Sequence, residues 1–191
     1  WAPYVYEHYL KDDKGRFFTV HRLMACLLTG FGLTMTLLQV PVYLLLGHNF
    51  RSSAIYFPFL FLAPICYCLG ETTGMGIGIS KKSYWNTLIF LASSVTTLGL
   101  SLWLIPLLQD AGAAIAAAAG AILSLGLRTA IGEKYYRAIT QYRYLGYTLG
   151  LMLAASLANY LLRDQTLVKY ALLLAVYGLA LYLFRREIAS L

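Results

Sequence analysis

Long apolar blocks separated by short polar stretches run along this chain. They span residues 23–46, 54–79, 85–108, 111–131, 145–162 and 167–184. Each is about as long as the ~18 residues that a helix needs to cross a ~30 Å hydrocarbon core. Backbone amides in lipid must bond within their own segment, and the blocks lack the alternation of barrel strands. The pattern therefore predicts an all-α polytopic membrane protein, a bundle of six transmembrane helices.

The connections between the blocks are short, so we expect one domain over residues 1–191. A charged, amphipathic lead-in over 1–16 precedes the first helix, which we expect over 17–46 because the polar end of the block can extend it. This first block is too long and too late for a cleavable signal. Residue 1 is Trp, and we expect that truncation or processing has removed a preceding segment. No connection is long enough for a catalytic domain, which predicts a transporter rather than an enzyme.

Composition supports the membrane assignment. Apolar residues make up 60% of the chain and charged residues 12%, whereas a soluble domain carries about 25% charged residues. The three cysteines, Cys26, Cys66 and Cys68, all lie in apolar blocks and are predicted to be inert buried thiols. No cofactor or metal motif is present.

The net charge of +7 is arranged asymmetrically. Six crossings would place both chain ends and the connections 80–84 and 132–144 on one side of the membrane. Twelve of the 15 Lys and Arg residues fall on that side: Lys11, Lys14, Arg16, Arg22, Lys81, Lys82, Arg128, Lys134, Arg137, Arg143, Arg185 and Arg186. The positive-inside rule therefore predicts that both ends are cytoplasmic, and the charge points to membrane lipid rather than to nucleic acid.

Glu71 is the sharpest candidate for chemistry. It lies ten residues before Lys81, so in a continuous helix it would be about 15 Å inside the membrane. A carboxylate at that depth is costly unless it is protonated, paired or hydrated. Two interpretations stay open: Glu71 bonds to neighbouring polar groups as part of the structure, or it is a cation or proton site. The glycines that follow it, Gly74, Gly76 and Gly78, favour close helix packing, because no strand precedes them to form a phosphate loop.

Two arginines at block ends form a second candidate site. Arg22 and Arg128 both fall on the predicted cytoplasmic side, where either could extend to the interface. Alternatively, their guanidinium groups could bind an anionic headgroup, because Arg binds phosphate oxygens in a bidentate way.

A stripe of small residues lies in the fourth block. Gly112, Ala116, Gly120 and Ser124 recur every four residues and so share one helix face. Such a face lets a neighbouring helix approach closely. It predicts helix packing, and the same feature would suit a helix that slides during alternating access.

Five short runs together resemble a known family. They are LLLGHNFRSSA (44–54), PFLFL (58–62), GIGISKK (76–82), LIP (104–106) and AGAAIA (111–116). In order and spacing they resemble the C-terminal half of the O-antigen type oligosaccharide flippases of the multidrug/oligosaccharidyl-lipid/polysaccharide exporter superfamily. The likeness covers roughly residues 40–140.

The resemblance implies translocation of an undecaprenyl-diphosphate-linked oligosaccharide repeat unit across the bacterial cytoplasmic membrane, for polysaccharide biosynthesis. It also implies two helical lobes around a polar cavity, so a six-helix chain would need a missing N-terminal lobe or another chain. A cation-coupled drug exporter of the same superfamily, a membrane enzyme of the pathway and a non-transporting scaffold remain alternatives. The family offers no motif that assigns substrate contacts, so Arg22, Arg128 and Glu71 remain predictions from physical chemistry.

Overall fold

The computed structural model describes residues 14–46, 53–137, 142–163 and 165–188, and these residues form helices and no strand. The predicted all-α class is thereby confirmed. Six helices are long: α2 (Lys14–Leu37), α4 (Phe57–Thr73), α6 (Tyr84–Leu108), α7 (Asp110–Tyr135), α8 (Arg143–Leu161) and α9 (Thr166–Leu183). Three are short: α3 (Gln39–Leu46), α5 (Met75–Ile79) and α10 (Arg185–Ile188).

Five segments are long and apolar enough to cross a membrane. They are Gly15–Leu37, Ser53–Thr73, Tyr84–Leu108, Asp110–Tyr135 and Thr166–Leu183. The sixth predicted crossing corresponds to α8, which has 19 residues but lower hydropathy, because it carries the buried polar residues Thr148, Ser156 and Asn159. This apolar architecture is that of a membrane protein.

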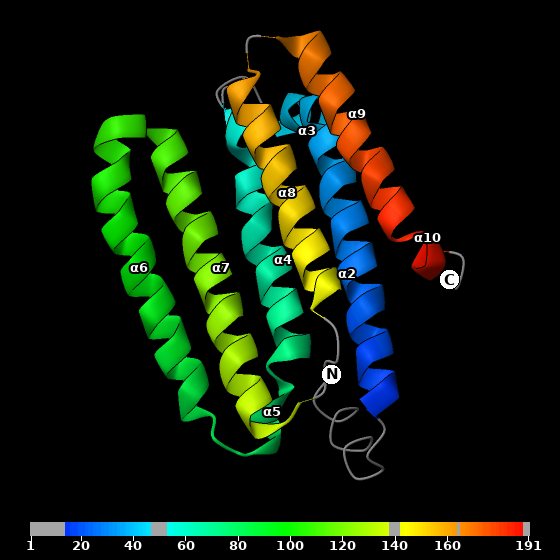
Figure 1. Ribbon diagram of the computed structural model, residues 1–191. Coiled ribbons are helices and arrows are strands. Elements are labelled where there is room, and N and C mark those ends of the chain that lie inside the picture. The colour runs from blue at the N-terminus through cyan, green and yellow to red at the C-terminus, as the bar shows by residue number, and fades with distance from the viewer. Residues whose placement is uncertain (1–13, 47–52, 138–141, 164, 189–191) are drawn as a thin grey trace.

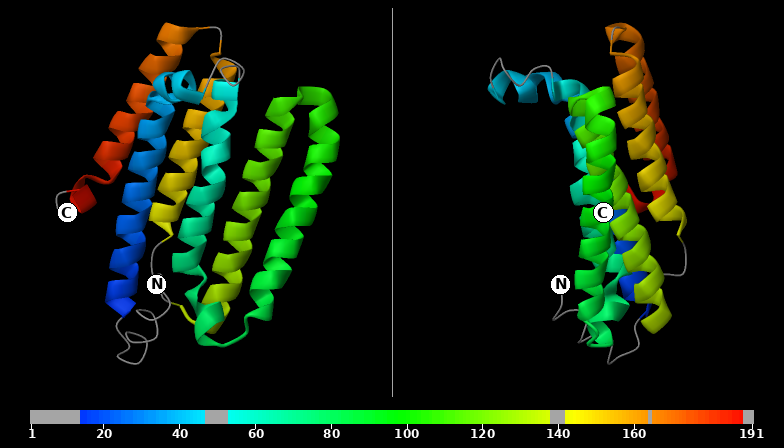
Figure 2. Two further views of the ribbon diagram at one scale, coloured as in Figure 1. Left: turned by 180° about the vertical axis from the view of Figure 1, so that it is seen from behind. Right: turned by 90° about the vertical axis from the view of Figure 1, so that its left-hand side faces the viewer.

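The six long helices lie side by side and roughly along one axis (Figure 1). Helix α4 packs on α2, α7 and α8, while α6 and α9 form opposite edges of the bundle (Figures 1 and 2). The apolar core lies between α2, α4, α7 and α8, where Leu62, Leu69, Leu125 and Met152 are fully or almost fully buried. Helix α6 packs mainly on α7, and Ile89 is its only buried residue. Many of its other apolar side chains, among them Leu98, Leu102 and Trp103, are exposed on the outer face of the bundle.

The first apolar block is two helices, where the sequence predicted one over 17–46. Helix α2 ends at Leu37, and α3 leaves the bundle axis at a steep angle (Figure 2). Pro41 has no N–H to donate to the Leu37 carbonyl, although the flanking bonds from Leu38 N to Thr34 O (2.9 Å) and from Val42 N to Leu38 O (3.1 Å) are kept. The missing donor and the proline ring account for the bend. Of the predicted lead-in over 1–16, residues 1–13 lie outside the described residues.

The second block is also divided, into α4 and α5, where the sequence predicted one helix over 54–79. The break is at Gly74, whose N–H bonds to the Gly70 carbonyl at 2.8 Å. Glu71 therefore lies in the last turn of α4 rather than in the middle of a longer helix. The other long helices begin or end within a few residues of the predicted boundaries, the largest difference being α7, which continues to Tyr135.

Candidate functional site

Three consecutive polar residues, Glu71, Thr72 and Thr73, form the last turn of α4. Each contacts a polar side chain of a neighbouring helix. We call this group the polar seam, and it consists of those three residues and their partners His21, Arg128 and Thr129. Polar groups inside a membrane bundle are costly unless they are paired, so a cluster of them is a candidate site.

The strongest contact of the polar seam joins α4 to α7. Arg128 Nη1 donates to Glu71 Oε1, and the two groups form an ion pair. The Arg128 side chain is 9% exposed, whereas that of Glu71 is 43% exposed. The cation is thus enclosed and the carboxylate is accessible from outside the bundle.

Helix geometry and ring stacking explain how Arg128 is accommodated. A Cβ atom on Gly70 would lie 3.1 Å from Arg128 Cδ, so the glycine makes room for the arginine stem. The guanidinium carbon lies 5.3 Å from the Tyr67 ring centroid and 5.8 Å from that of Phe90. Cation–π attraction therefore adds to the carboxylate in stabilising the charge. Arg128 Nε has no hydrogen-bond partner among the described residues, which leaves one donor of a buried cation unused.

The other two α4 residues of the polar seam, Thr72 and Thr73, contact side chains of α2 and α7. His21 Nδ1 lies 2.8 Å from Thr72 Oγ1, and Thr129 Oγ1 lies 2.9 Å from Thr73 Oγ1. Thr72 Oγ1 donates its hydrogen to the Leu69 carbonyl (2.7 Å), so His21 Nδ1 is the donor in their bond. Within the described residues this leaves His21 Nε2 fully buried and without a partner.

Close backbone contact holds the seam together at the α4–α5 break. A Cβ atom on Gly76 would overlap the Gly132 carbonyl oxygen of α7, and one on Gly132 would lie 2.8 Å from Gly74 Cα. Gly74, Gly76 and Gly132 thus bring the α4–α5 break and the end of α7 to backbone contact, which is the packing use predicted for Gly74 and Gly76; a Cβ atom on Gly78, for which the same was predicted, would meet nothing within 4 Å.

A groove of about 410 Å³ opens between α4, α6 and α7. Tyr67 and Phe90, the two rings that flank Arg128, belong to its wall, so Arg128 lies next to the groove although neither Arg128 nor Glu71 lines it. The rest of the wall combines small or apolar side chains with hydroxyl groups: Ala63, Pro64, Cys68, Ser93, Thr97, Ala117, Ala121 and Ser124. Small residues on α7 create the space, and the wall is mainly apolar, with a few hydroxyl groups.

The small-residue stripe of α7 faces α6. A Cβ atom on Gly112 would lie 2.5 Å from the Leu104 carbonyl oxygen, and one on Gly120 would overlap Thr97 Oγ1. Ser93 Oγ donates to the Gly120 carbonyl at 2.8 Å. Ala116 is fully buried, and Ser124, the last residue of the stripe, lines the groove. The stripe therefore sets the α6–α7 distance beside the groove.

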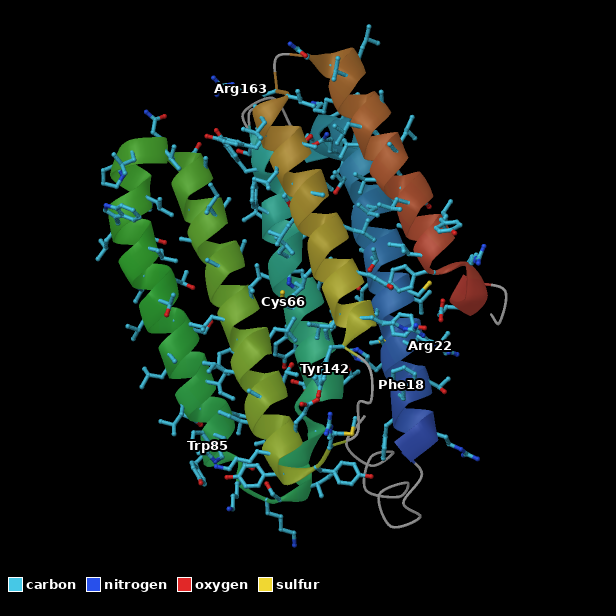
Figure 3. All side chains as sticks on the ribbon, viewed as in Figure 1. Phe18, Arg22, Cys66, Trp85, Tyr142 and Arg163 are labelled. Carbon is cyan, nitrogen blue, oxygen red and sulfur yellow. The ribbon has the colours of Figure 1, made fainter. Side chains whose placement is uncertain are left out.

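Arg22 and Arg128 do not form one site. Arg22 lies on α2, on the side facing α10 and away from α7 (Figure 3). Its Nε is 3.5 Å from Glu187 Oε1, and Glu187 also accepts a 2.8 Å hydrogen bond from Tyr144 Oη. Each arginine thus has its own carboxylate partner, and the two guanidinium groups are not placed to bind one headgroup together. Headgroup binding by either arginine alone stays a prediction.

A further buried network was not predicted from the sequence. Gln39 Nε2 donates to Asn159 Oδ1 (2.8 Å), and Asn159 Nδ2 donates to the Ile55 carbonyl (2.8 Å). It ties α8 to the α2–α3 bend and to the start of α4, at the end of the bundle opposite the polar seam. The amide side chains of Gln39 and Asn159, which lie within otherwise apolar blocks, were the sequence feature that could have indicated this network. The network fixes helix ends.

Metal binding has little support in the described part of the chain, where no group of three or more His, Cys, Asp or Glu residues is close enough to hold an ion. Cys26 and Cys66 are buried, Cys68 is partly exposed, and all three are free thiols.

Comparison with known proteins identifies no relative, because no family model, curated protein or solved structure matches the chain.

Proposed function

We propose that this chain is one helical lobe of a membrane transporter that translocates a lipid-linked oligosaccharide of the undecaprenyl-diphosphate type. The observation that carries the proposal is the Arg128–Glu71 pair next to a mainly apolar groove; in this pair the cation is buried and the carboxylate is accessible. A fixed structural pair needs no open carboxylate, whereas a coupling site does, because a proton or cation must reach it.

The mechanism follows from the asymmetry of the pair. In the resting state Glu71 holds Arg128. A proton or metal cation that neutralises Glu71 leaves the guanidinium without a counterion, and a guanidinium cannot discharge by losing its own proton. Diphosphate oxygens are then the replacement partner, since Arg binds them through bidentate, charge-assisted hydrogen bonds. Binding and release thus alternate with the charge of Glu71, without covalent chemistry or a cofactor.

The groove suits a substrate with a charged head and a lipid tail. Its wall lies between α4, α6 and α7, and α6 is the outer, lipid-facing edge of the bundle. A polyprenyl tail can therefore stay in the bilayer while the headgroup reaches Arg128. The groove is open on the side away from α4, α6 and α7, and a second lobe or another chain would close it.

The same proposal places the chain in the bacterial cytoplasmic membrane with six crossings, α8 being the sixth. Helix α9 runs in the opposite direction to α2 (Figure 1), as the first and last of an even number of crossings do. The described cations Lys81, Lys82, Lys134 and Arg137 follow α5 or lie at or just beyond the end of α7, at the end of the bundle where α2 begins (Figure 1), and the positive-inside rule predicts that this end is cytoplasmic.

A cation-coupled drug exporter is the second candidate. The Tyr67 and Phe90 rings that flank Arg128 would also stack on an organic cation. In that case Glu71, rather than Arg128, would bind the substrate.

The two candidates separate in a translocation assay on the complete protein in proteoliposomes. Arg128→Gln should lower translocation of a polyprenyl-diphosphate oligosaccharide about tenfold or more, since one charge-assisted hydrogen bond is worth about 1.5–3 kcal/mol. The matched control is Lys134→Gln, which removes an exposed charge from the end of the same helix and should leave translocation unchanged.

Other outcomes assign the chain differently. An unchanged rate in Arg128→Gln contradicts the headgroup role. Export of an organic cation that survives Arg128→Gln and fails in Glu71→Gln favours the drug exporter. A complete protein that moves neither substrate would be a scaffold.

A further inference from the structure

A second pocket, of about 260 Å³, lies at the corner where α8 begins and α9 ends. Most of its wall is polar. The residues that matter are Arg143, Tyr144 and Tyr147 of α8, Tyr182 at the end of α9, and Arg185 and Glu187 of α10. We call it the corner pocket. It shares no residue with the polar seam or with the groove between α4, α6 and α7.

Two arginines are held in place at this pocket by aromatic rings. The guanidinium carbon of Arg143 lies 4.9 Å from the Tyr144 ring centroid, and that of Arg185 lies 4.9 Å from the Tyr182 centroid. Arg143 Nη2 also donates to Tyr144 Oη at 3.1 Å. Each guanidinium has five N–H donors, so stacking and one hydrogen bond leave most donors available to a ligand.

The one carboxylate in the wall is already compensated. Glu187 is 2% exposed, accepts a hydrogen bond from Tyr144 Oη at 2.8 Å and lies 3.5 Å from Arg22 Nε. Arg22 therefore offsets the Glu187 charge from the α2 side. The remaining charge in the pocket is that of Arg143 and Arg185, and it is positive.

The position of the pocket identifies the kind of anion. Arg185 is two residues beyond the end of the segment Thr166–Leu183, which is long and apolar enough to cross a membrane, so the pocket lies where that segment would leave the bilayer. Lipid phosphate groups lie at this level, and basic pockets between membrane helices bind anionic headgroups there. Tyrosines are also enriched at this level, where the ring is apolar and the hydroxyl is hydrated.

We propose that the corner pocket binds the phosphate group of an anionic phospholipid through Arg143 and Arg185. This lipid is a resident of the bilayer and not the transported substrate, so the site is independent of the proposed function. The tyrosine rings orient the two guanidinium groups, and Arg22 takes part only by neutralising Glu187.

The test is native mass spectrometry of the complete protein in neutral detergent, titrated with phosphatidylglycerol or with phosphatidylcholine. The wild type should retain phosphatidylglycerol in preference. Arg143→Gln with Arg185→Gln should weaken its binding about thirtyfold, because each cation near a membrane surface contributes roughly a factor of five. Arg143→Lys with Arg185→Lys keeps the charge but not the planar fork, and should fall between.

Lys169→Gln is the matched control, because Lys169 lies near the opposite end of α9, with its Nζ 5.3 Å from the Tyr170 ring centroid. It should bind phosphatidylglycerol as the wild type does. Equal binding of the two lipids by the wild type would overturn the proposal, and so would unchanged phosphatidylglycerol binding in the double glutamine variant. Inorganic phosphate is the third titrant, and if it displaces phosphatidylglycerol completely, the site is one for a free anion.

Discussion

Two arginine–carboxylate pairs among the described residues have their burial reversed. In the pair between α4 and α7, the Arg128 side chain is 9% exposed and Glu71 is 43% exposed. In the pair between α2 and α10, Arg22 is 29% exposed and Glu187 is 2% exposed. The carboxylate is the more exposed group of the first pair, and the guanidinium is the more exposed group of the second.

The difference decides what each pair can do. A buried carboxylate that loses its partner can be neutralised by a proton, but a buried guanidinium stays charged at any accessible pH. Loss of the Glu71 charge therefore leaves the Arg128 cation buried without a counterion, so that another anion is favoured there. Loss of the Arg22 charge leaves no buried cation behind. For this reason we assign substrate binding to the first pair and a structural role to the second.

The largest effect that we predict concerns the contact between α5 and α7, which helps to position Arg128 against Glu71. Gly76→Ala should destabilise the protein by about 3 kcal/mol, the upper part of the range for an overpacked site, because its Cβ would overlap the Gly132 carbonyl oxygen. Helix α7, which carries Arg128, would be displaced from α4 and α5. Unfolding in detergent with increasing denaturant measures the change.

Gly78→Ala is the control for that variant. Gly78 lies in the same short helix, and a Cβ there would meet nothing within 4 Å. We expect it to be neutral or slightly stabilising, by up to about 1 kcal/mol, because Ala is the better helix former. If both variants lost equal stability, the cause would be the α5 backbone and not the contact with α7.

A smaller difference in stability should separate the two pairs. Glu71→Gln leaves a buried cation without its counterion and should cost about 3 kcal/mol, near the low end for breaking a buried pair. Arg22→Gln should cost about 1 kcal/mol, because Arg22 is 29% exposed, its Nε is 3.5 Å from Glu187, and Glu187 keeps the hydrogen bond from Tyr144 Oη. The same unfolding titration measures both.

Equal costs in the two variants would contradict the assignment of opposite roles.

The helices were largely predictable, because a long uninterrupted apolar run in a lipid-facing segment is satisfied by a helix. Helix α6 matches its predicted range to within one residue, since its apolar run is uninterrupted and its sides face outward. The departures occur where local chemistry interrupts an apolar run: at Pro41, which removes a backbone donor, and at Gly74, where α5 turns against α7.

The candidate site was predictable only as separate residues. Glu71 and Arg128 were both singled out, but they are 57 positions apart and were assigned to different tasks. Their pairing depends on which faces of α4 and α7 meet, and Gly70, Gly76 and Gly132 decide that in three dimensions. Glu187, the partner of Arg22, was not singled out at all, because an acid near the end of the chain resembles an ordinary solvated residue.

The central claim is that the Arg128–Glu71 pair works in transport and the Arg22–Glu187 pair does not. It is tested most directly by two doubly neutral variants of the complete protein. These are Glu71→Gln with Arg128→Gln, and Arg22→Gln with Glu187→Gln. Neither leaves a stranded buried charge, so both should fold with stability within about 1 kcal/mol of the wild type.

The measurement is the rate of lipid-linked oligosaccharide translocation in proteoliposomes that contain equal amounts of folded protein. Our account predicts that the first variant loses translocation while the second keeps the wild-type rate. Wild-type translocation by the Glu71→Gln/Arg128→Gln variant would contradict it.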